Sequence, residues 1–318
     1  MNNSSTTSLN PRLHGVADRL RASRYGRYLL ALAKAVIGYR GTRRDHLLEA
    51  EFYALASHRR YAVGGASDSG YFVGSTSDLS VSCYIYSSDT YELGRLQRAL
   101  SIANVSQDKT VIDVGANIGT AGLGALVSGA VSHCVSIEPD PTNYRLLRTN
   151  VMLNDLADRV TTINCAVGSN DNVMVRFASR SDYLGGSQVS ETGNIEVPMR
   201  TLATLREEYH VPTSAVGLVW VDVEGLEANV IASDLELFAA SAWVLELRSE
   251  ITDLAPLARL LLGRRVIVLT EHDRFDVERE LGQSEIQAMI DGSAGLIAYD
   301  VLVLPVKDAL TFPEGAQQ

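Results

Sequence analysis

The ten residues Thr110 to Gly119 constrain the fold of this chain more than any other stretch. They read Thr-Val-Ile-Asp-Val-Gly-Ala-Asn-Ile-Gly, so a β-branched apolar run, typical of a strand buried on both faces, ends abruptly at glycine. The Ala/Gly/Leu-rich segment 120–127 follows, and we expect it to be helical. A buried strand that turns directly into a helix leaves backbone N–H groups available to a polar ligand. The stretch therefore predicts an α/β fold with a ligand site at this turn.

The spacing of the turn departs from the dinucleotide fingerprint Gly-x-Gly-x-x-Gly, because Asn117 stands where the second glycine is expected. Residues 131–137 predict a second strand, which ends at Glu138. An acidic side chain at that place, about 20 residues after the glycine turn, usually holds a ribose diol. The two elements together indicate an adenosine-containing ligand that needs no pyrophosphate. S-adenosylmethionine fits that description.

Beyond Asp140 the helical and strand patterns alternate, which predicts a doubly wound, mostly parallel sheet. The later core strands are expected at 160–167, 216–221, 243–248, 265–270 and 296–305. Two further strands, 174–178 and 195–199, enclose the loop 179–194, whose length suits a lid or a substrate loop.

Composition divides the chain into four parts. We expect a basic helical extension over 1–60, a small β-element with a linking helix over 61–104, the main domain over 105–306 and a C-terminal tail over 307–318. Within the second part, glycines punctuate short apolar runs such as Val81 to Tyr86, which predict strands.

Charge is spread unevenly along the 318 residues, whose formal net charge is −10. Residues 1–60 hold 11 Lys/Arg against 4 Asp/Glu, and the remainder holds 17 against 34. The acidic body disfavours nucleic acid as a partner. The basic part contains an apolar helical stripe, Tyr25, Leu29, Leu32 and Val36, in a stretch too short to span a bilayer. Three interpretations stay open: packing on its own domain, a homodimer contact, or peripheral contact with an anionic membrane.

Three cysteines, Cys83, Cys134 and Cys165, lie far apart and show no C-x-x-C spacing. The last two fall inside predicted strands, where a free thiol packs as a small apolar side chain. Because no signal peptide is recognisable either, we expect a cytoplasmic protein, with the inner membrane face as the peripheral alternative.

Five motifs occur in a recognisable order. They are Val111-Ile112-Asp113-Val114-Gly115-Ala116-Asn117-Ile118-Gly119, Ile137-Glu138-Pro139-Asp140, Ala166-Val167-Gly168, Val221-Asp222-Val223-Glu224-Gly225 and Leu245-Glu246. From about residue 88 to residue 248 the chain thereby resembles the FkbM family of S-adenosylmethionine-dependent methyltransferases. One departure is Trp220, where the family often has lysine.

The resemblance implies a class I methyltransferase (Rossmann-like) fold with a mostly parallel, seven-stranded sheet. It also implies methyl transfer to a hydroxyl of a sugar, a glycolipid or a secondary metabolite, so that the partner is a small-molecule or glycan acceptor. The implied cofactor-binding residues are Asp113, Gly115, Ala116, Asn117, Gly119, Glu138, Pro139, Ala166 and Val167. Of these, the glycine turn lines the methionine end, Glu138 holds the ribose, and Ala166 and Val167 lie near the adenine.

Three acidic residues, Asp222, Glu224 and Glu246, are expected at strand ends on the rim where open α/β sheets bind ligands. A hydroxyl is a poor nucleophile at neutral pH, so a general base or a metal ion would assist methyl transfer. One interpretation makes one of the three the catalytic base. Another has Asp222 and Glu246 bind Mg²⁺, which prefers carboxylate oxygens. The structural alternatives are a helix cap for Asp222 and a salt bridge to Arg248 for Glu246.

Two other enzyme classes remain as alternatives. An N-methyltransferase acting on protein or nucleobase is disfavoured, because no Asn/Asp-Pro-Pro-Tyr/Phe signature follows the fourth strand, where Asp222-Val223-Glu224-Gly225 stands instead. An NAD-dependent oxidoreductase is disfavoured by Asn117 in the glycine turn. A binding module that retains the fold without activity is the remaining alternative.

Overall fold

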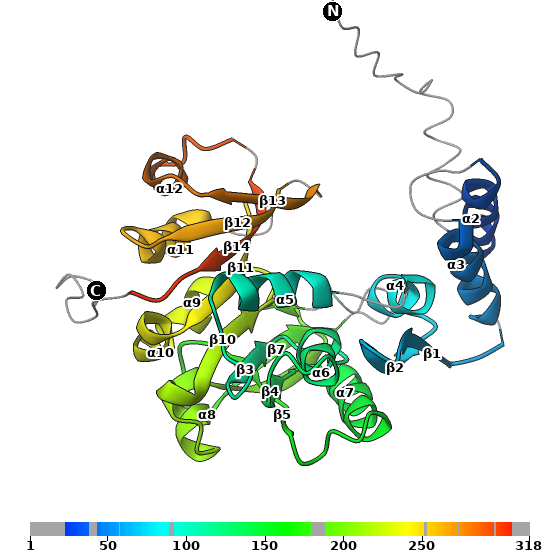
Figure 1. Ribbon diagram of the computed structural model, residues 1–318, viewed down its shortest axis with the longest axis horizontal. Helices are drawn as coiled ribbons and strands as arrows, with labels where there is room; N and C mark the ends of the chain where they lie inside the picture. The colour runs from blue at the N-terminus through cyan, green and yellow to red at the C-terminus, as the bar shows by residue number, and fades with distance from the viewer. Residues whose placement is uncertain are drawn as a thin grey trace, which may run out of the picture.

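An eight-stranded sheet forms the centre of the molecule, in the order β13-β12-β14-β11-β10-β3-β4-β5 (Figure 1). The computed structural model describes residues 23–37, 43–56, 58–88, 92–179, 188–250, 253–271, 274–295 and 297–306. The strands are β3 (Thr110–Val114), β4 (His133–Ile137), β5 (Val160–Ile163), β10 (Val216–Val221), β11 (Ala242–Arg248), β12 (Val266–Glu271), β13 (Arg274–Glu280) and β14 (Ala298–Val303). The expected doubly wound α/β fold is confirmed. The seven strands expected become eight, because β13 pairs antiparallel with β12.

The neighbouring strands β11, β10, β3, β4 and β5 run parallel to one another. Strand β14 lies between β11 and β12 and is antiparallel to both. Apolar side chains cover both faces of β3, since Val111 packs into one core cluster and Ile112 and Val114 into the other. The helices of the first cluster are α4 (Val81–Ser88), α5 (Leu93–Ile102), α6 (Thr120–Val127) and α7 (Pro141–Leu153). Those of the second are α8 (Leu202–Glu208), α9 (Glu227–Ala232), α10 (Leu235–Ala240), α11 (Leu254–Leu261) and α12 (Gln283–Ile290).

A separate four-stranded sheet, in the order β6-β9-β7-β8, follows β5. Its strands are β6 (Ala166–Val167), β7 (Val173–Ala178), β8 (Gln188–Val189) and β9 (Ile195–Arg200). The strands expected at 174–178 and 195–199 are therefore present, but outside the central sheet. Residues 180–187, the middle of the expected lid loop, lie outside the described residues.

The described residues of the N-terminal part form the helices α2 (Arg24–Ile37) and α3 (Arg43–Leu55) and a hairpin of β1 (Tyr61–Ala66) and β2 (Gly70–Ser75). The strand expected over Val81 to Tyr86 is wrong, because this run is the helix α4 (Val81–Ser88). Asp78 caps its first turn by accepting hydrogen bonds from the N–H of Ser80 at 3.1 Å and of Ser82 at 2.7 Å. In the part of the chain described here, no helix has the length and apolar character needed to cross a membrane.

Candidate active site

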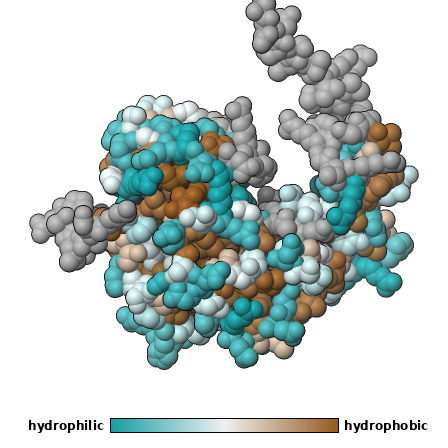
Figure 2. Space-filling view, viewed as in Figure 1, coloured by the Kyte–Doolittle hydropathy of each residue, from teal (hydrophilic) through white to brown (hydrophobic). Residues whose placement is uncertain are grey.

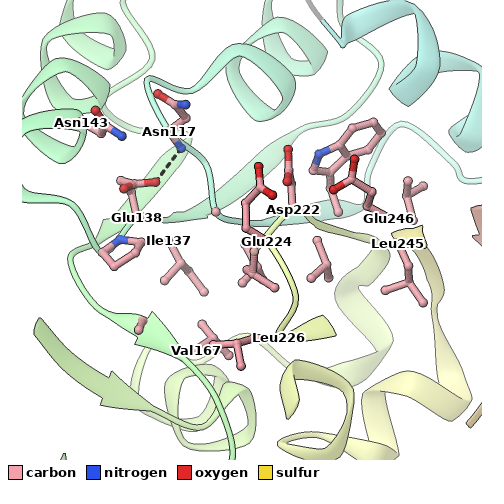
Figure 3. A pocket seen from close by; sticks show the side chains of 18 of the residues that line it. Asn117, Ile137, Glu138, Asn143, Val167, Asp222, Glu224, Leu226, Leu245 and Glu246 are labelled. Atoms are coloured by element: carbon pink, nitrogen blue, oxygen red, sulfur yellow. Dashed lines mark hydrogen bonds between the residues drawn. The ribbon is translucent and has the colours of Figure 1, made fainter. Parts of the chain in front are cut away.

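A cavity of about 190 Å³ lies at the carboxyl ends of β3, β4, β10 and β11 (Figure 3). From β3 the chain proceeds outward through β4 and β5, then returns to β10 on the other side of β3. Ligands of open α/β sheets bind at such a switch point. Nine of the expected site residues line the cavity: Gly115, Asn117, Glu138, Pro139, Ala166, Val167, Asp222, Glu224 and Glu246.

Gly115 brings the ends of β3 and β10 into direct contact. Its φ is 84°, and a Cβ at this position would lie 1.9 Å from the carbonyl oxygen of Asp222. The N–H of Asp222 in turn donates to the Val114 carbonyl at 3.0 Å. Only glycine permits both the positive φ and this approach, so the turn fixes where the Asp222 side chain enters the cavity.

Asp113, Ala116 and Gly119, expected at the cofactor, do not line the cavity. Asp113 is buried, and its Oδ2 accepts a hydrogen bond from the N–H of Gly122 in α6 at 3.1 Å. Burial, and then the nearby charge of Glu92, raise the pKa of Asp113 to about 7. Ala116 is buried and Gly119 is the N-cap of α6, with a φ of 97°. These three residues therefore support the conformation of the turn without lining the cavity.

Glu138 presents a fixed carboxylate at the end of β4. Its Oε2 accepts from the N–H of Asn117 at 2.8 Å (Figure 3). Its Oε1 accepts from the N–H of Asp140 at 2.8 Å. Burial raises its pKa to about 8. Each carboxylate oxygen has a further lone pair, so this group can accept hydrogen bonds from a ligand diol.

Two buried acceptors at the cavity wall lack partners. The Oδ1 atoms of Asn117 and Asn143 are buried, and neither accepts a hydrogen bond within the described part of the chain. Both residues line the cavity, and Asn143 lies in the first turn of α7. An unsatisfied buried acceptor costs about 1–3 kcal/mol, which a ligand donor would recover. Sequence reasoning missed Asn143, because no motif or spacing marks it.

The three expected acidic residues converge on one side of the cavity, where Figure 3 shows their side chains entering together. The side chain of Asp222 makes no hydrogen bond to any described residue, and its pKa is raised well above the usual range by burial and then by the charge of Glu246. Burial also raises the pKa of Glu246 to about 7, although Arg248 lies 3.4 Å from it. The expected salt bridge between Glu246 and Arg248 is present, and Glu246 still faces the cavity.

Two further carboxyl groups, Glu92 and Asp300, were missed by the sequence analysis. Arg95 of α5 hydrogen-bonds Asp300 and lies 3.6 Å from Glu92. Its guanidinium carbon stands 5.7 Å from the ring centroid of Trp220. Thr120 donates to Glu92 at 2.9 Å. The signal for Asp300 was a single charged residue inside an otherwise apolar strand, whereas nothing in the sequence pointed to Glu92.

The described lining of the cavity is strongly acidic. The lining contains two guanidinium groups, those of Arg95 and Arg248, and six carboxyl groups. The carboxyl groups belong to Glu92, Glu138, Asp222, Glu224, Glu246 and Asp300. Like charges in a buried site oppose one another's ionisation, and a bound cation relieves that repulsion. The cavity therefore favours a positively charged ligand.

The expected Mg²⁺ site at Asp222 and Glu246 is not supported. Within the ranges that the structure covers, no group of three or more His, Cys, Asp or Glu side chains is arranged to hold a metal ion. All three cysteines are free and buried, and burial had been expected of Cys134 and Cys165.

The doubly wound sheet, with a cavity at its switch point, is a Rossmann-like α/β fold of the class I methyltransferase type. A family model described as the methyltransferase FkbM domain matches residues 113–273. The chain belongs to the FkbM methyltransferase family, as the resemblance predicted.

Several solved structures are similar to this chain. Methyltransferase FkbM from Methylobacillus flagellatus KT is 14% identical with a TM-score of 0.39, over 62% of this chain and 44% of that chain. Precorrin-6y C5,15-methyltransferase from Geobacter metallireducens GS-15 is 13% identical with a TM-score of 0.39, over 66% and 87%. TYW2 from M. jannaschii, in complex with AdoMet, is 11% identical with a TM-score of 0.38, over 77% and 85%. This chain thus spans less than half of the FkbM structure's length. Among curated proteins, none matches.

Proposed function

We propose that the protein transfers the methyl group of S-adenosylmethionine to a hydroxyl of a sugar, a glycolipid or a secondary metabolite. The observation that carries the proposal is the acidic cavity at the switch point, with Asp222 unpaired among the described residues and Glu138 fixed beside the glycine turn. S-adenosylmethionine has positive charges at its sulfur and its amino group and a ribose diol. The positive charges match the carboxyl groups of the cavity, and the ribose diol matches the Glu138 carboxylate.

The residues present fit that cofactor. The Glu138 carboxylate would accept hydrogen bonds from the ribose hydroxyls. The unpaired Oδ1 atoms of Asn117 and Asn143 would accept from donors on the same ligand. Asp222 would pair with positive charge at the methionine end, and Ala166 and Val167 would supply an apolar wall for the adenine.

The carboxylates also suit the chemistry of the acceptor. When bound, S-adenosylmethionine supplies an electrophilic methyl group, whose bond to sulfur breaks as the bond to the acceptor oxygen forms. The acceptor hydroxyl must lose its proton, and Glu246 is the group we assign as the base. A pKa of about 7 leaves this carboxylate partly ionised at neutral pH while it still binds a proton well. Alignment of the two reactants in the cavity supplies the rest of the rate enhancement.

The acceptor would enter beside Asp222, where Arg95, Trp220 and Asp300 line the cavity together with Ser80 at the start of α4. Carboxylates and a guanidinium can hydrogen-bond several hydroxyls at once. This supports a polyhydroxylated acceptor.

Isothermal titration of the protein with S-adenosylmethionine and, separately, with NAD tests the cofactor. We expect binding of the first and none of the second; binding of NAD alone would refute the proposal. Transfer of labelled methyl to hydroxyl-bearing glycans and metabolites, run beside peptide and nucleoside amines, then tests the acceptor atom. Labelling confined to the amines would replace O-methylation with N-methylation.

A further inference from the structure

The outward face of α2 is apolar. Tyr25, Leu29, Ala33 and Val36 follow one another at intervals of four, four and three residues, which places them on one side of the helix. Tyr25 is 72% exposed, Leu29 39% and Val36 82%. Apolar surface gathers over this helix in the upper right of Figure 2. We call these four residues the α2 stripe.

The opposite side of α2 is already packed within its own chain. Ala31 is fully buried in a cluster with Phe52 of α3, and Lys34 forms an ion pair with Glu49 of α3 at 3.2 Å. The residues of the α2 stripe therefore do not belong to the side of the helix that packs against α3. The stripe is a second apolar face, which the described part of the chain leaves exposed.

Charge favours one occupant for this face. The stripe belongs to the segment 1–60, which holds 11 Lys/Arg against 4 Asp/Glu. Two copies joined stripe to stripe would bring two such cationic segments together, which like-charge repulsion opposes. An anionic bilayer offers an apolar interior to the stripe and negative headgroups to the arginines.

Length fixes the orientation on such a surface. The 14 residues of α2 extend about 21 Å, short of the roughly 30 Å hydrocarbon core, so the helix would lie in the plane of the interface. Figure 1 places α2 and α3 at one end of the molecule, beyond α4 and away from the central sheet. Contact at that end leaves the rest of the fold outside the lipid.

We propose that the α2 stripe docks this protein on an anionic lipid surface, with the helix axis parallel to the membrane. Membrane docking is independent of the proposed methyl transfer, because binding to vesicles is measured without measuring activity.

Co-sedimentation of the full chain with phosphatidylcholine vesicles, with and without phosphatidylglycerol, tests the docking. We expect binding to the anionic vesicles only, and weaker binding at high salt. The double variant Leu29→Glu/Val36→Glu should lower the partition coefficient about tenfold or more, since two apolar side chains lose their burial in lipid. Met152→Glu is the matched control, because Met152 is an apolar side chain on α7 that is 67% exposed, and it should bind as the unmodified protein does.

A second variant keeps the stripe apolar and so guards against misfolding. Val36→Trp should show a blue shift of tryptophan emission on adding anionic vesicles, whereas the native Trp220 and Trp243 are already buried. Equal binding to both kinds of vesicle, no binding to either, or full binding by the double variant would overturn the proposal. A dimer in light scattering that the double variant converts to monomer would assign the stripe to a second copy instead.

Discussion

The side-chain amide of Asn150 holds the backbone of the glycine turn, since its Nδ2 donates to the carbonyl oxygen of Ile118 at 2.9 Å. The Oδ1 of the same side chain accepts from the N–H of Val73 at 2.7 Å. Asn150 is fully buried in α7, so one amide ties the β1–β2 hairpin to the loop that lines the cavity. The N-terminal hairpin is thereby connected to the glycine turn as well as to its own helices.

We expect Asn150→Ala to lower the free energy of unfolding by about 2–3 kcal/mol, because the buried carbonyl of Ile118 and the half-buried N–H of Val73 lose their side-chain partner. Asn154→Ala is the control. Asn154 hydrogen-bonds Tyr71 at 2.8 Å at an exposed position, so its loss should cost less than about 1 kcal/mol. Urea unfolding of both variants measures the difference, and equal losses would contradict the assigned role.

Gly115→Ala should destabilise the protein severely and abolish S-adenosylmethionine binding, because the new Cβ would lie 1.9 Å from the Asp222 carbonyl. Gly129 also has a positive φ, of 71°, but a Cβ there meets nothing within 4 Å. Gly129→Ala should therefore show only the backbone strain, about 1 kcal/mol. Thermal unfolding and cofactor titration of both variants test this, and similar losses would mean that the close approach at Gly115 is unimportant.

Asp222→Asn should weaken S-adenosylmethionine binding about tenfold or more, since a charge-assisted contact is lost. The ligand-free protein should become no less stable at neutral pH, because the substitution removes repulsion from the neighbouring carboxylates. The exposed Glu191, changed to Gln, serves as the control and should alter neither quantity. Unchanged affinity in Asp222→Asn would remove this residue from the binding site.

Glu246→Gln should lower kcat by about 10²–10⁴, the usual contribution of a general base, and leave S-adenosylmethionine affinity nearly unchanged. The unmodified enzyme should lose activity as pH falls below about 7, where Glu246 becomes protonated. That acidic limb should vanish in Glu246→Gln and persist in Glu224→Gln. If instead Glu224→Gln alone removes the limb, the base is Glu224.

The ligand-free protein should be less stable at about pH 8 than at about pH 6. The pKa of Asp113 is raised to about 7, that of Glu138 to about 8 and that of Glu246 to about 7. A carboxyl with a higher pKa in the folded than in the unfolded chain binds more protons when folded, so stability falls as pH rises from about 4 to about 8. Thermal unfolding across that range measures the fall, and bound S-adenosylmethionine should reduce it. A melting temperature that rises with pH would contradict the assignment.

The strand, the glycine turn and Glu138 could be predicted because local sequence determines them. Thr110–Val114 is apolar on both faces, and Glu138 follows the next strand at the distance typical of a ribose-binding acid. Helix α4 was misread, since its Val, Ile and Tyr residues are typical of strands. The contrary signal was Asp78, three residues before α4 begins, because its carboxylate accepts hydrogen bonds from the N–H of Ser80 and of Ser82 in the first turn.

The rest of the cavity depends on contacts between distant parts of the chain. Arg95 meets Asp300 across 205 residues of sequence, and no local pattern encodes that pairing. Asn143 acquires its position from α7 docking on the sheet, not from a motif. Side chains whose environment is made by tertiary packing are the ones that sequence reasoning missed.

The placement of β14 has a consequence for how the molecule is made. This strand is late in the chain, yet it fills the slot between β11 and β12, and its Asp300 lines the cavity. Until the ribosome has released residues 298–303, β11 and β12 each present an open edge to other nascent chains. The cavity is therefore incomplete until β14 has joined the sheet, because Asp300 reaches it from this strand.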